Sequence, residues 1–421
     1  MESNEKSSEE EKYARKPIPE SRKKHWIAVA AIYFGMTAAL SSFANGGALI
    51  SGLSLSHSII AILVATTLLV FLFFVPVGYI GAREGLNTYT IGESAFGSQG
   101  SNIATAFVIS IIPNVGWYGV QVSIASDALT QVLGGSDALR PWLMIGLGIT
   151  FCLPAMFGIV GMAWLDYLAV PAILIITVYG FNKAISITGF DGLWSFEPAI
   201  TESILWGANI MIGSMVVGAS FVSDYTRWTK NKVSHVAYAG MGGIFPPLLI
   251  LTIIAAMMGI SASSLGNIDE PWNIAEVMEV LGLPLISLAL VIIMQWSTNI
   301  TSSYSAGLAL KNVFGWSRFW WTLIAAVIGT ILSLVGIMNY FIEFLDTLAA
   351  FVSPAAGVIL SEYYFVSKRK LNQKEGIYWP GVGSWLIGGL AALFIPLSIP
   401  AVNGLIISAL AYYVYHVISK K

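Results

Sequence analysis

The sequence predicts an all-α polytopic membrane protein with twelve transmembrane helices, and three observations predict this class. Hydrophobic residues make up 56% of the 421-residue chain and charged residues only 10%, whereas about 25% of an ordinary soluble protein is charged. Twelve apolar windows are long enough to cross a hydrocarbon core that is about 30 Å thick. The basic residues are distributed unevenly among the connecting segments, as expected for a membrane protein with a defined orientation.

The expected spans follow one another along nearly the whole chain, each near 20 residues or longer because a helix rises about 1.5 Å per residue. They cover approximately residues 27–51, 55–81, 99–131, 141–158, 162–187, 204–224, 236–261, 281–309, 317–336, 339–362, 379–396 and 398–418. Residues 1–25 are rich in Glu, Lys and Ser, which predicts a disordered tail and no signal peptide.

The distribution of basic residues predicts the orientation. If the N-terminus is cytoplasmic, Arg140 and Lys183 are the two of the 21 Lys and Arg residues that fall in outside segments. The positive-inside rule predicts such an asymmetry, and one span more or fewer in the middle of the chain would destroy it. We therefore expect a multi-pass protein of the cell membrane with both termini in the cytoplasm.

Composition also excludes several classes of protein. The formal net charge is −2, so there is no basic field for nucleic acid. The single cysteine, Cys152, excludes a disulfide framework and a thiolate metal cluster, and the four histidines are too far apart for a zinc motif. No nucleophile and base stand together as an enzyme would need, so we expect no catalytic residues and no cofactor other than a coupling ion.

Glycine and small polar residues interrupt the first and sixth spans, five spans apart. They are Gly35, Ser41, Ser42, Asn45, Gly46 and Gly47 in the first, and Gly207, Gly213, Ser214, Gly218, Ser220 and Ser223 in the sixth. A five-helix inverted repeat would place two broken helices at these equivalent positions, near the bilayer midplane. The alternative is that small residues only allow close helix packing.

Two further spans carry polar stripes. In the eighth, Met294, Ser297, Thr298 and Thr301 share one stripe, and Gln295, Asn299, Ser302 and Ser303 share the adjoining one. The first stripe offers oxygen ligands for a hard cation, and the second offers amides for a neutral polar ligand. In the third span, Asn114, Trp117 and Gln121 share a face that suits a planar heterocycle. Helix packing is the alternative for both spans.

Ionisable residues inside spans are costly and often functional. The candidates are Asp127, Asp166, Glu202, Asp224, Glu343, Asp346 and Glu362. Most lie near span ends, where solvation is a sufficient explanation. Asp224 and Arg227 are three residues apart and could pair. Glu343 and Asp346 could form a proton relay, although their place near the start of the tenth span argues against it.

Several stretches resemble the nucleobase–cation symporter family, and within it the bacterial cytosine and purine permeases. They are YFGMTAALSSFANGGALISGLS (33–54), GYIGAREGLNTYTIGESAFGSQGS (78–101), NVGWYGVQV (114–122), SFVSDYTRW (220–228) and QWSTNITSSYSAGL (295–308). The resemblance covers about residues 17–415. It implies a LeuT-type fold: a ten-helix core over 26–362, with repeats over 27–187 and 204–362, and two additional helices over 379–418.

The resemblance also implies the site residues. Sodium would be held by the carbonyls of Gly35, Ala38 and Met294 and the hydroxyls of Ser297 and Thr298. The substrate would contact Trp117, Asn114, Gln121, Ser214, Met215, Gly218 and Asn299. Two positions depart from the cytosine permeases, which have a glutamine at position 114 and an aromatic residue at 215. Hydantoin-type relatives carry a glutamine at position 121, as this chain does, so the pocket is a mixture.

These observations lead us to expect a sodium-coupled importer of a nucleobase or related planar nitrogen heterocycle, working by alternating access. Its partners would be this small-molecule substrate and the lipid bilayer. The alternative is proton-coupled symport of a compound such as allantoin, a hydantoin or hydroxymethylpyrimidine. A passive channel belongs to a different class, and its pore would be expected to carry rings of equivalent groups rather than one amide-rich pocket.

Overall fold

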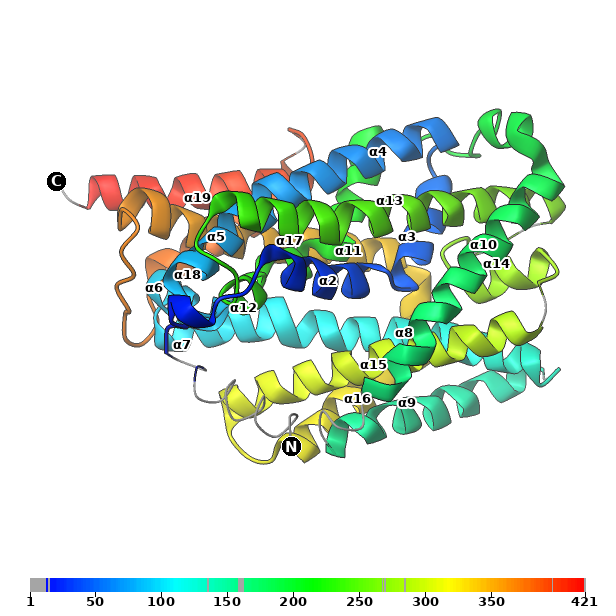
Figure 1. The fold of residues 1–421 in the computed structure, drawn as a ribbon, viewed down its shortest axis with the longest axis horizontal. Coiled ribbons are helices and arrows are strands. Elements are labelled where there is room, and N and C mark those ends of the chain that lie inside the picture. Colours follow the sequence, from blue (N-terminus) through cyan, green and yellow to red (C-terminus); the bar gives the residue numbers. More distant parts are fainter. Residues whose placement is uncertain are drawn as a thin grey trace.

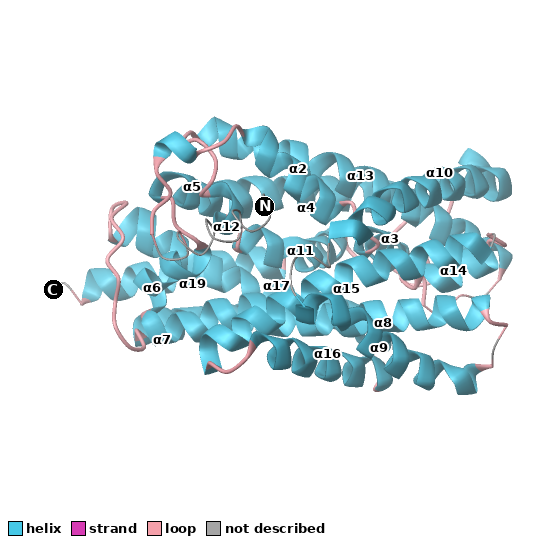
Figure 2. Ribbon diagram, turned by 60° about the horizontal axis from the view of Figure 1, so that its bottom comes forward, coloured by secondary structure: helices cyan, strands magenta, loops and turns pink. Residues whose placement is uncertain are grey.

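The chain is helical throughout the part that the structure, a computed structural model, describes. This part comprises residue 13 and residues 16–134, 136–157, 163–266, 268, 270–283, 285–395 and 397–419. Within it there is no strand, and one isolated bridge joins Lys24 to Thr229. Figures 1 and 2 show long helices that run side by side, as expected for a membrane-spanning bundle.

The helices fall close to the expected spans. In chain order the α-helices are α2 (Trp26–Thr37), α3 (Ser41–Ile50), α4 (Leu55–Leu68), α5 (Val75–Glu84), α6 (Thr88–Phe96), α7 (Ser98–Ser101), α8 (Ile112–Val132), α9 (Arg140–Phe157), α10 (Ala163–Trp194), α11 (Ile204–Ser220), α12 (Ser223–Thr226), α13 (Val233–Leu265), α14 (Ile274–Val280), α15 (Leu285–Phe314), α16 (Arg318–Leu334), α17 (Phe341–Leu360), α18 (Trp379–Phe394) and α19 (Pro400–Ile418).

Short wider or tighter turns join some of these helices. The π-helical segments are η2 (Leu69–Phe74), η3 (Asn102–Ile111) and η7 (Ser361–Val366). The 3₁₀ segments are η1 (Glu20–Arg22), η4 (Asp137–Leu139) and η6 (Ile337–Tyr340). Through η2, α4 and α5 form one rod over Leu55–Glu84, and through η3 the third span extends over Ser98–Val132.

Among the described residues, seven helices are long and apolar enough to cross a membrane, or eight if α2 and α3 form one bent span. Three shorter apolar helices correspond to α9, α16 and α18. Helix α15, with 30 residues, occupies the eighth expected span. Each expected span therefore overlaps a helix, and the number of twelve crossings stays a prediction.

Two groups of helices pack separately. Helices α8, α9, α15 and α16 contact one another, and α2, α3, α4 and α11 pack with α13 or with each other. The two groups lie on opposite sides of the molecule in Figures 1 and 2. Helix α10 contacts both α13 and α15 and crosses the bundle obliquely. Helices α18 and α19 pack on α17, so the two additional helices adjoin the predicted core.

The N-terminal segment is packed rather than disordered where the structure describes it. Ile18 is only 3% exposed, and its amide donates to the Gly85 carbonyl (3.0 Å). Nη1 of Arg227 donates to the carbonyl of Tyr13 (2.9 Å). The prediction of a disordered tail is therefore wrong for residues 13 and 16–25. The buried Ile18 side chain fixes this segment on the protein although its average composition is polar. Residues 1–12, 14 and 15 lie outside the described residues.

Candidate functional site

The first span breaks where its backbone faces a cavity. Helix α2 ends at Thr37 and α3 begins at Ser41, with a bend of 58° between them. The amide of Ala39 donates to the Thr37 carbonyl (2.8 Å) instead of the Gly35 carbonyl four residues earlier. The amide of Ser42 likewise donates to Ala39 (3.0 Å) and not to Ala38. The break therefore releases two of the three carbonyls predicted to bind sodium, those of Gly35 and Ala38.

This break opens into a cavity of about 480 Å³. All five predicted sodium ligands line it: Gly35, Ala38, Met294, Ser297 and Thr298. Helix α15 supplies the last three from one face, and the Thr298 hydroxyl donates to the Met294 carbonyl (3.0 Å). Backbone carbonyls from a broken helix and hydroxyls from a facing helix form an oxygen-rich set, which is what a hard cation requires.

The predicted face of the third span lines the same cavity. Asn114, Trp117 and Gln121 all contribute to its wall from α8. The Trp117 ring makes edge contacts with Phe341 and Phe344, at centroid distances of 5.8 and 5.7 Å. These contacts fix the indole between two rings of the tenth span, so that it presents a rigid apolar surface beside two carboxamides.

Helix α11 supplies a third wall with Ser214, Met215 and Gly218. Asn299 is the one predicted substrate residue that does not line the cavity. It is 0% exposed, and neither polar atom of its amide has a hydrogen-bond partner among the described residues. The sixth span is interrupted between α11 and α12, at Phe221 and Val222, and so near its C-terminal end and not at its middle, because α11 is continuous from Ile204 to Ser220.

Sequence reasoning missed several lining residues. Tyr33 lines the cavity, and its hydroxyl donates to the Gly218 carbonyl (2.9 Å), which joins α2 to α11. Phe221 lines it at the point where α11 ends. Thr301 and Ser302 also line it, and their positions on the two polar stripes of the eighth span were the available signal. Tyr33 carried no such signal because it belongs to an apolar run.

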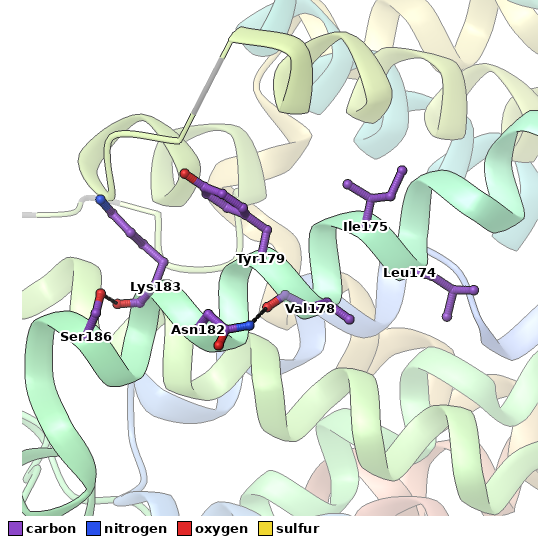
Figure 3. Close-up of a pocket in the computed structure, with 7 residues that line it drawn as sticks. All are labelled: Leu174, Ile175, Val178, Tyr179, Asn182, Lys183 and Ser186. Atoms are coloured by element: carbon purple, nitrogen blue, oxygen red, sulfur yellow. Dashed lines mark hydrogen bonds between the residues drawn. The ribbon is translucent and has the colours of Figure 1, made fainter.

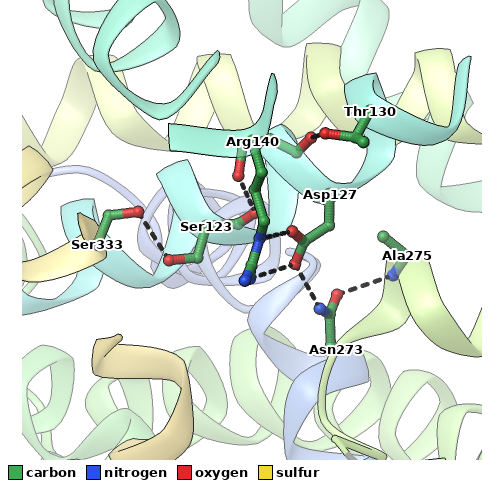
Figure 4. Close-up of polar contacts among 8 residues, drawn as sticks. Ser123, Asp127, Thr130, Arg140, Asn273, Ala275 and Ser333 are labelled. Carbon is green, nitrogen blue, oxygen red and sulfur yellow. Dashed lines mark hydrogen bonds and ion pairs between the residues drawn. The ribbon is translucent and has the colours of Figure 1, made fainter. Parts of the chain in front are cut away.

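The ionisable residues that the structure describes lie elsewhere. Asp127 pairs with Arg140, through Nη2 to Oδ2 at 3.1 Å, and accepts from Nδ2 of Asn273 (2.6 Å), as Figure 4 shows. The Asp346 carboxylate accepts from Nδ2 of Asn209 (2.7 Å). These contacts join helix ends and do not involve the cavity lining. Asp166 lies outside the residues whose side chains are described.

The expected pairing of Asp224 with Arg227 takes another form. The Asp224 carboxylate accepts the backbone amide of Thr88 (2.7 Å), at the N-terminus of α6. Nε of Arg227 donates to the backbone carbonyl of Asp224 (3.1 Å). A carboxylate at a helix N-terminus is favourable because unpaired amides and the helix dipole both attract it.

The other ionisable candidates also have structural roles. Glu362 is buried, accepts from the Tyr412 hydroxyl (2.7 Å) and lies 3.3 Å from Nζ of Lys374. Burial lowers the pKa of Lys374, and Glu362 opposes that shift. Glu202 precedes α11, and Glu343 is exposed in the first turn of α17. None of these residues contributes to the described lining of the cavity.

A second hollow, on the surface of α10, is shown in Figure 3. Its volume is about 880 Å³, and its lining residues all belong to α10. Leu174, Ile175 and Val178 are each more than half exposed. Asn182 and Ser186 donate to carbonyls of their own helix, at 2.7 and 2.8 Å. An exposed apolar face on one helix suits contact with lipid, and no predicted site residue lies there.

The comparison with known families decides the identity of the fold and the class of protein. Residues 17–385 match the family model described as permease for cytosine/purines, uracil, thiamine, allantoin. The chain belongs to this permease family. It is accordingly a transporter and not an enzyme, and a multi-pass membrane protein.

Relatives of this permease match over nearly its whole length. The cytosine permease of Escherichia coli (strain K12) is 27% identical over 413 residues, which cover 97% of this chain and 94% of the relative. The hydantoin permease of Microbacterium maritypicum is 26% identical, covering 92% of this chain and 84% of the relative.

Solved structures show the same fold. The inward-facing conformation of Mhp1 superimposes with a TM-score of 0.82 at 18% identity, covering 97% of this permease and 95% of that chain. A Na⁺-coupled sialic acid symporter superimposes with a TM-score of 0.65 at 13% identity, covering 97% and 91%. The predicted LeuT-type fold is thereby confirmed, and these likenesses show the fold alone.

Proposed function

We propose that this permease imports a nucleobase or a related planar nitrogen heterocycle together with sodium by alternating access, across the cell membrane with both termini in the cytoplasm. One observation carries the proposal. The carbonyls released by the break between α2 and α3 line the same cavity as the hydroxyls of α15 and the Trp117 face of α8. An ion and a flat ligand can therefore occupy adjacent positions between two helix groups.

Sodium fits the oxygen set better than a proton does. Carbonyls at a helix break, together with hydroxyls, are typical sodium ligands in transporters built on broken helices. No Asp, Glu or His is among the described residues that line the cavity, so no side chain with an ordinary pKa near neutrality is present there to carry a proton. Sodium bound at the junction of α2 and α15 would order the pocket, and the resulting coupling to substrate affinity is reciprocal.

The lining also favours a neutral substrate. Trp117 supplies a stacking surface, Met215 supplies a polarisable side chain, and Asn114 and Gln121 supply amides. A thioether packs on a ring face, although less rigidly than an aromatic residue does. The curated relatives include permeases for cytosine, hydantoin and allantoin. These substrates share a small nitrogen-rich framework, and the cavity has polar groups for such a framework without charge to pair with an ion.

A ligand screen tests the proposal. Purified protein is heated with cytosine, uracil, adenine, hypoxanthine, allantoin, hydantoin and hydroxymethylpyrimidine, in sodium or in choline chloride, and the melting temperature is measured. We expect at least one heterocycle to stabilise the protein, and more strongly in sodium. Uptake into proteoliposomes then compares an inward sodium gradient with a pH gradient. Uptake driven by pH alone would contradict sodium coupling, and uptake that never exceeds equilibrium would indicate a channel.

Substitution of the stacking residue tests the substrate position. We expect Trp117→Ala to abolish binding of every planar ligand found in the screen, because the indole provides the rigid face in the cavity. Trp142→Ala is the matched control, since Trp142 is 72% exposed on α9. Retained affinity in Trp117→Ala would remove the stacking role.

A further inference from the structure

Several polar groups of the cavity wall each donate one hydrogen to a backbone carbonyl. The Tyr33 hydroxyl donates to the Gly218 carbonyl (2.9 Å), and the Thr298 hydroxyl donates to the Met294 carbonyl (3.0 Å). Nδ2 of Asn114 donates one of its two hydrogens to the Ser110 carbonyl (2.7 Å) and keeps the other. A hydroxyl has one proton and two lone pairs, so each of these hydroxyls offers the cavity only an acceptor.

Ser214 repeats this pattern with a second partner. Its hydroxyl donates to the Met211 carbonyl (2.9 Å), and its oxygen accepts Nδ2–H of Asn45 (2.9 Å). Asn45 lies on α3, is 0% exposed and does not line the cavity. The proton and one lone pair of Ser214 are thus both engaged. One acceptor lone pair remains for a ligand.

Gln121 offers another acceptor. It lines the cavity and is 5% exposed, and its Oε1 is buried without a hydrogen-bond partner among the described residues. A buried oxygen without a partner is unfavourable, and a donor on the ligand would relieve it. Ser214 on α11 and Gln121 on α8 line the cavity from different walls.

We propose that this cavity selects heterocycles by their N–H donors, which Ser214 and Gln121 accept, and that Asn45 is a positioning residue that holds the Ser214 hydroxyl as an acceptor. The inference rests on the proposed function and names the hydrogen-bonding class of its substrate. Ring N–H groups of lactams and ureides meet the requirement. Heterocycles whose ring nitrogens are alkylated do not.

Paired ligands measure this selectivity. Cytosine, uracil and hydantoin are each compared with their ring N-methyl derivatives and with their 5-methyl isomers, which add the same volume but keep every N–H. For the heterocycle that binds, we expect at least one N-methyl derivative to bind about ten-fold more weakly or worse, because an acceptor of the site loses its donor. The 5-methyl isomer is expected to bind within about three-fold of the parent.

Variants then assign the selectivity to residues. In Ser214→Ala and in Asn45→Ala, we expect the N-methyl penalty, measured as the ratio of dissociation constants, to fall at least about five-fold. Asn45→Asp keeps the side-chain volume and removes the N–H, so it replaces Asn45→Ala if that protein does not fold. The matched control is Asn403→Ala, a buried asparagine of α19 whose Nδ2 donates to the Ile395 carbonyl (3.0 Å).

The outcomes separate the inference from the proposed function. A wild-type protein that binds no heterocycle overturns both. Binding with equal affinity for N-methyl and 5-methyl isomers overturns the selectivity but not the transport proposal. A penalty that falls in Ser214→Ala but stays within about two-fold of wild type in both Asn45 variants overturns the role of Asn45. A penalty that falls equally in Asn403→Ala also overturns it, because that change acts only through general packing.

Discussion

The first and sixth spans look alike in sequence but differ in structure. Each combines glycines with serines, yet the first is bent by 58° after Thr37 and the sixth is continuous to Ser220. The bend does not fall on a glycine: it spans Ala38, Ala39 and Leu40. Gly46 lies where α13 approaches, and a Cβ there would be 2.6 Å from the Thr252 carbonyl oxygen.

Glycine in the sixth span has the same packing role. A Cβ at Gly213 would lie 2.1 Å from the Leu345 carbonyl oxygen, so α11 and α17 touch through their backbones. What distinguishes the first span is local hydrogen bonding. The Thr37 carbonyl accepts both the Ala39 amide and the Ser42 hydroxyl (2.8 Å each), which replaces the regular helical pattern. Small residues therefore marked helix contacts, while Ser42 in the first turn of α3 marked the break.

The largest expected effect tests whether the break in the first span contributes to sodium binding. Ser297→Ala and Thr298→Ala each remove a hydroxyl from a residue that lines the same cavity as the carbonyls released at the break. We expect each change to abolish sodium stimulation of uptake and of ligand-induced stabilisation. Ser303→Ala is the control, because that hydroxyl donates to the Asn299 carbonyl (2.8 Å) and does not line the cavity. Unchanged sodium dependence in both variants would rule out this ion site.

The second effect concerns stability and tests the packing role of glycine. Gly213→Ala forces the α11 backbone away from Leu345, and overpacking of this kind destabilises by about 3 kcal/mol. Gly218→Ala is the control in the same helix, because a Cβ there meets nothing within 4 Å. It should be neutral or stabilise by about 0.5–1 kcal/mol. Melting temperatures of the two variants measure the difference, and equal values would contradict the packing explanation.

A smaller effect tests the cause of the break. Ser42→Ala removes the hydroxyl that donates a hydrogen bond to the Thr37 carbonyl. We expect the free energy of unfolding to fall by about 1 kcal/mol. We also expect a higher sodium concentration for half-maximal stabilisation, because the released carbonyls become less fixed. In the sixth span, Ser220→Ala should not destabilise, since the buried Ser220 hydroxyl has no partner among the described residues. If Ser220→Ala needed a higher sodium concentration for half-maximal stabilisation and Ser42→Ala did not, the proposed difference between the two spans would be contradicted.

The smallest effect concerns Glu270, in the connection that precedes α14, near α3 of the first span. Burial raises the pKa of Glu270, and the nearby Asp127 raises it further. The folded state therefore keeps this proton to higher pH than the unfolded state, and stability declines as pH rises above the ordinary value of 4.5. Glu270→Gln should melt higher than wild type at pH 7 and equally at pH 4. Glu279→Gln, at an exposed position, should melt like wild type at both.

Much of the candidate site could be predicted because its chemistry is local. Asn114, Trp117 and Gln121 lie on one face of one helix, and so do Ser297 and Thr298, so helical periodicity alone groups them. Asn299 was misplaced because a helical wheel does not show which neighbouring helix covers a stripe. Asn45 could not be assigned because its contact with Ser214 joins positions 169 residues apart.

Amino-acid composition and the placement of basic residues were sufficient for the membrane class, the positions of the helices and the expected orientation, since transfer into lipid depends on the side chains of each segment alone. Only the tertiary structure decided where the first helix breaks, which glycines serve packing and which polar groups face the cavity. Those outcomes depend on competition among hydrogen-bond partners from different helices, and that competition exists only once the helices are packed together.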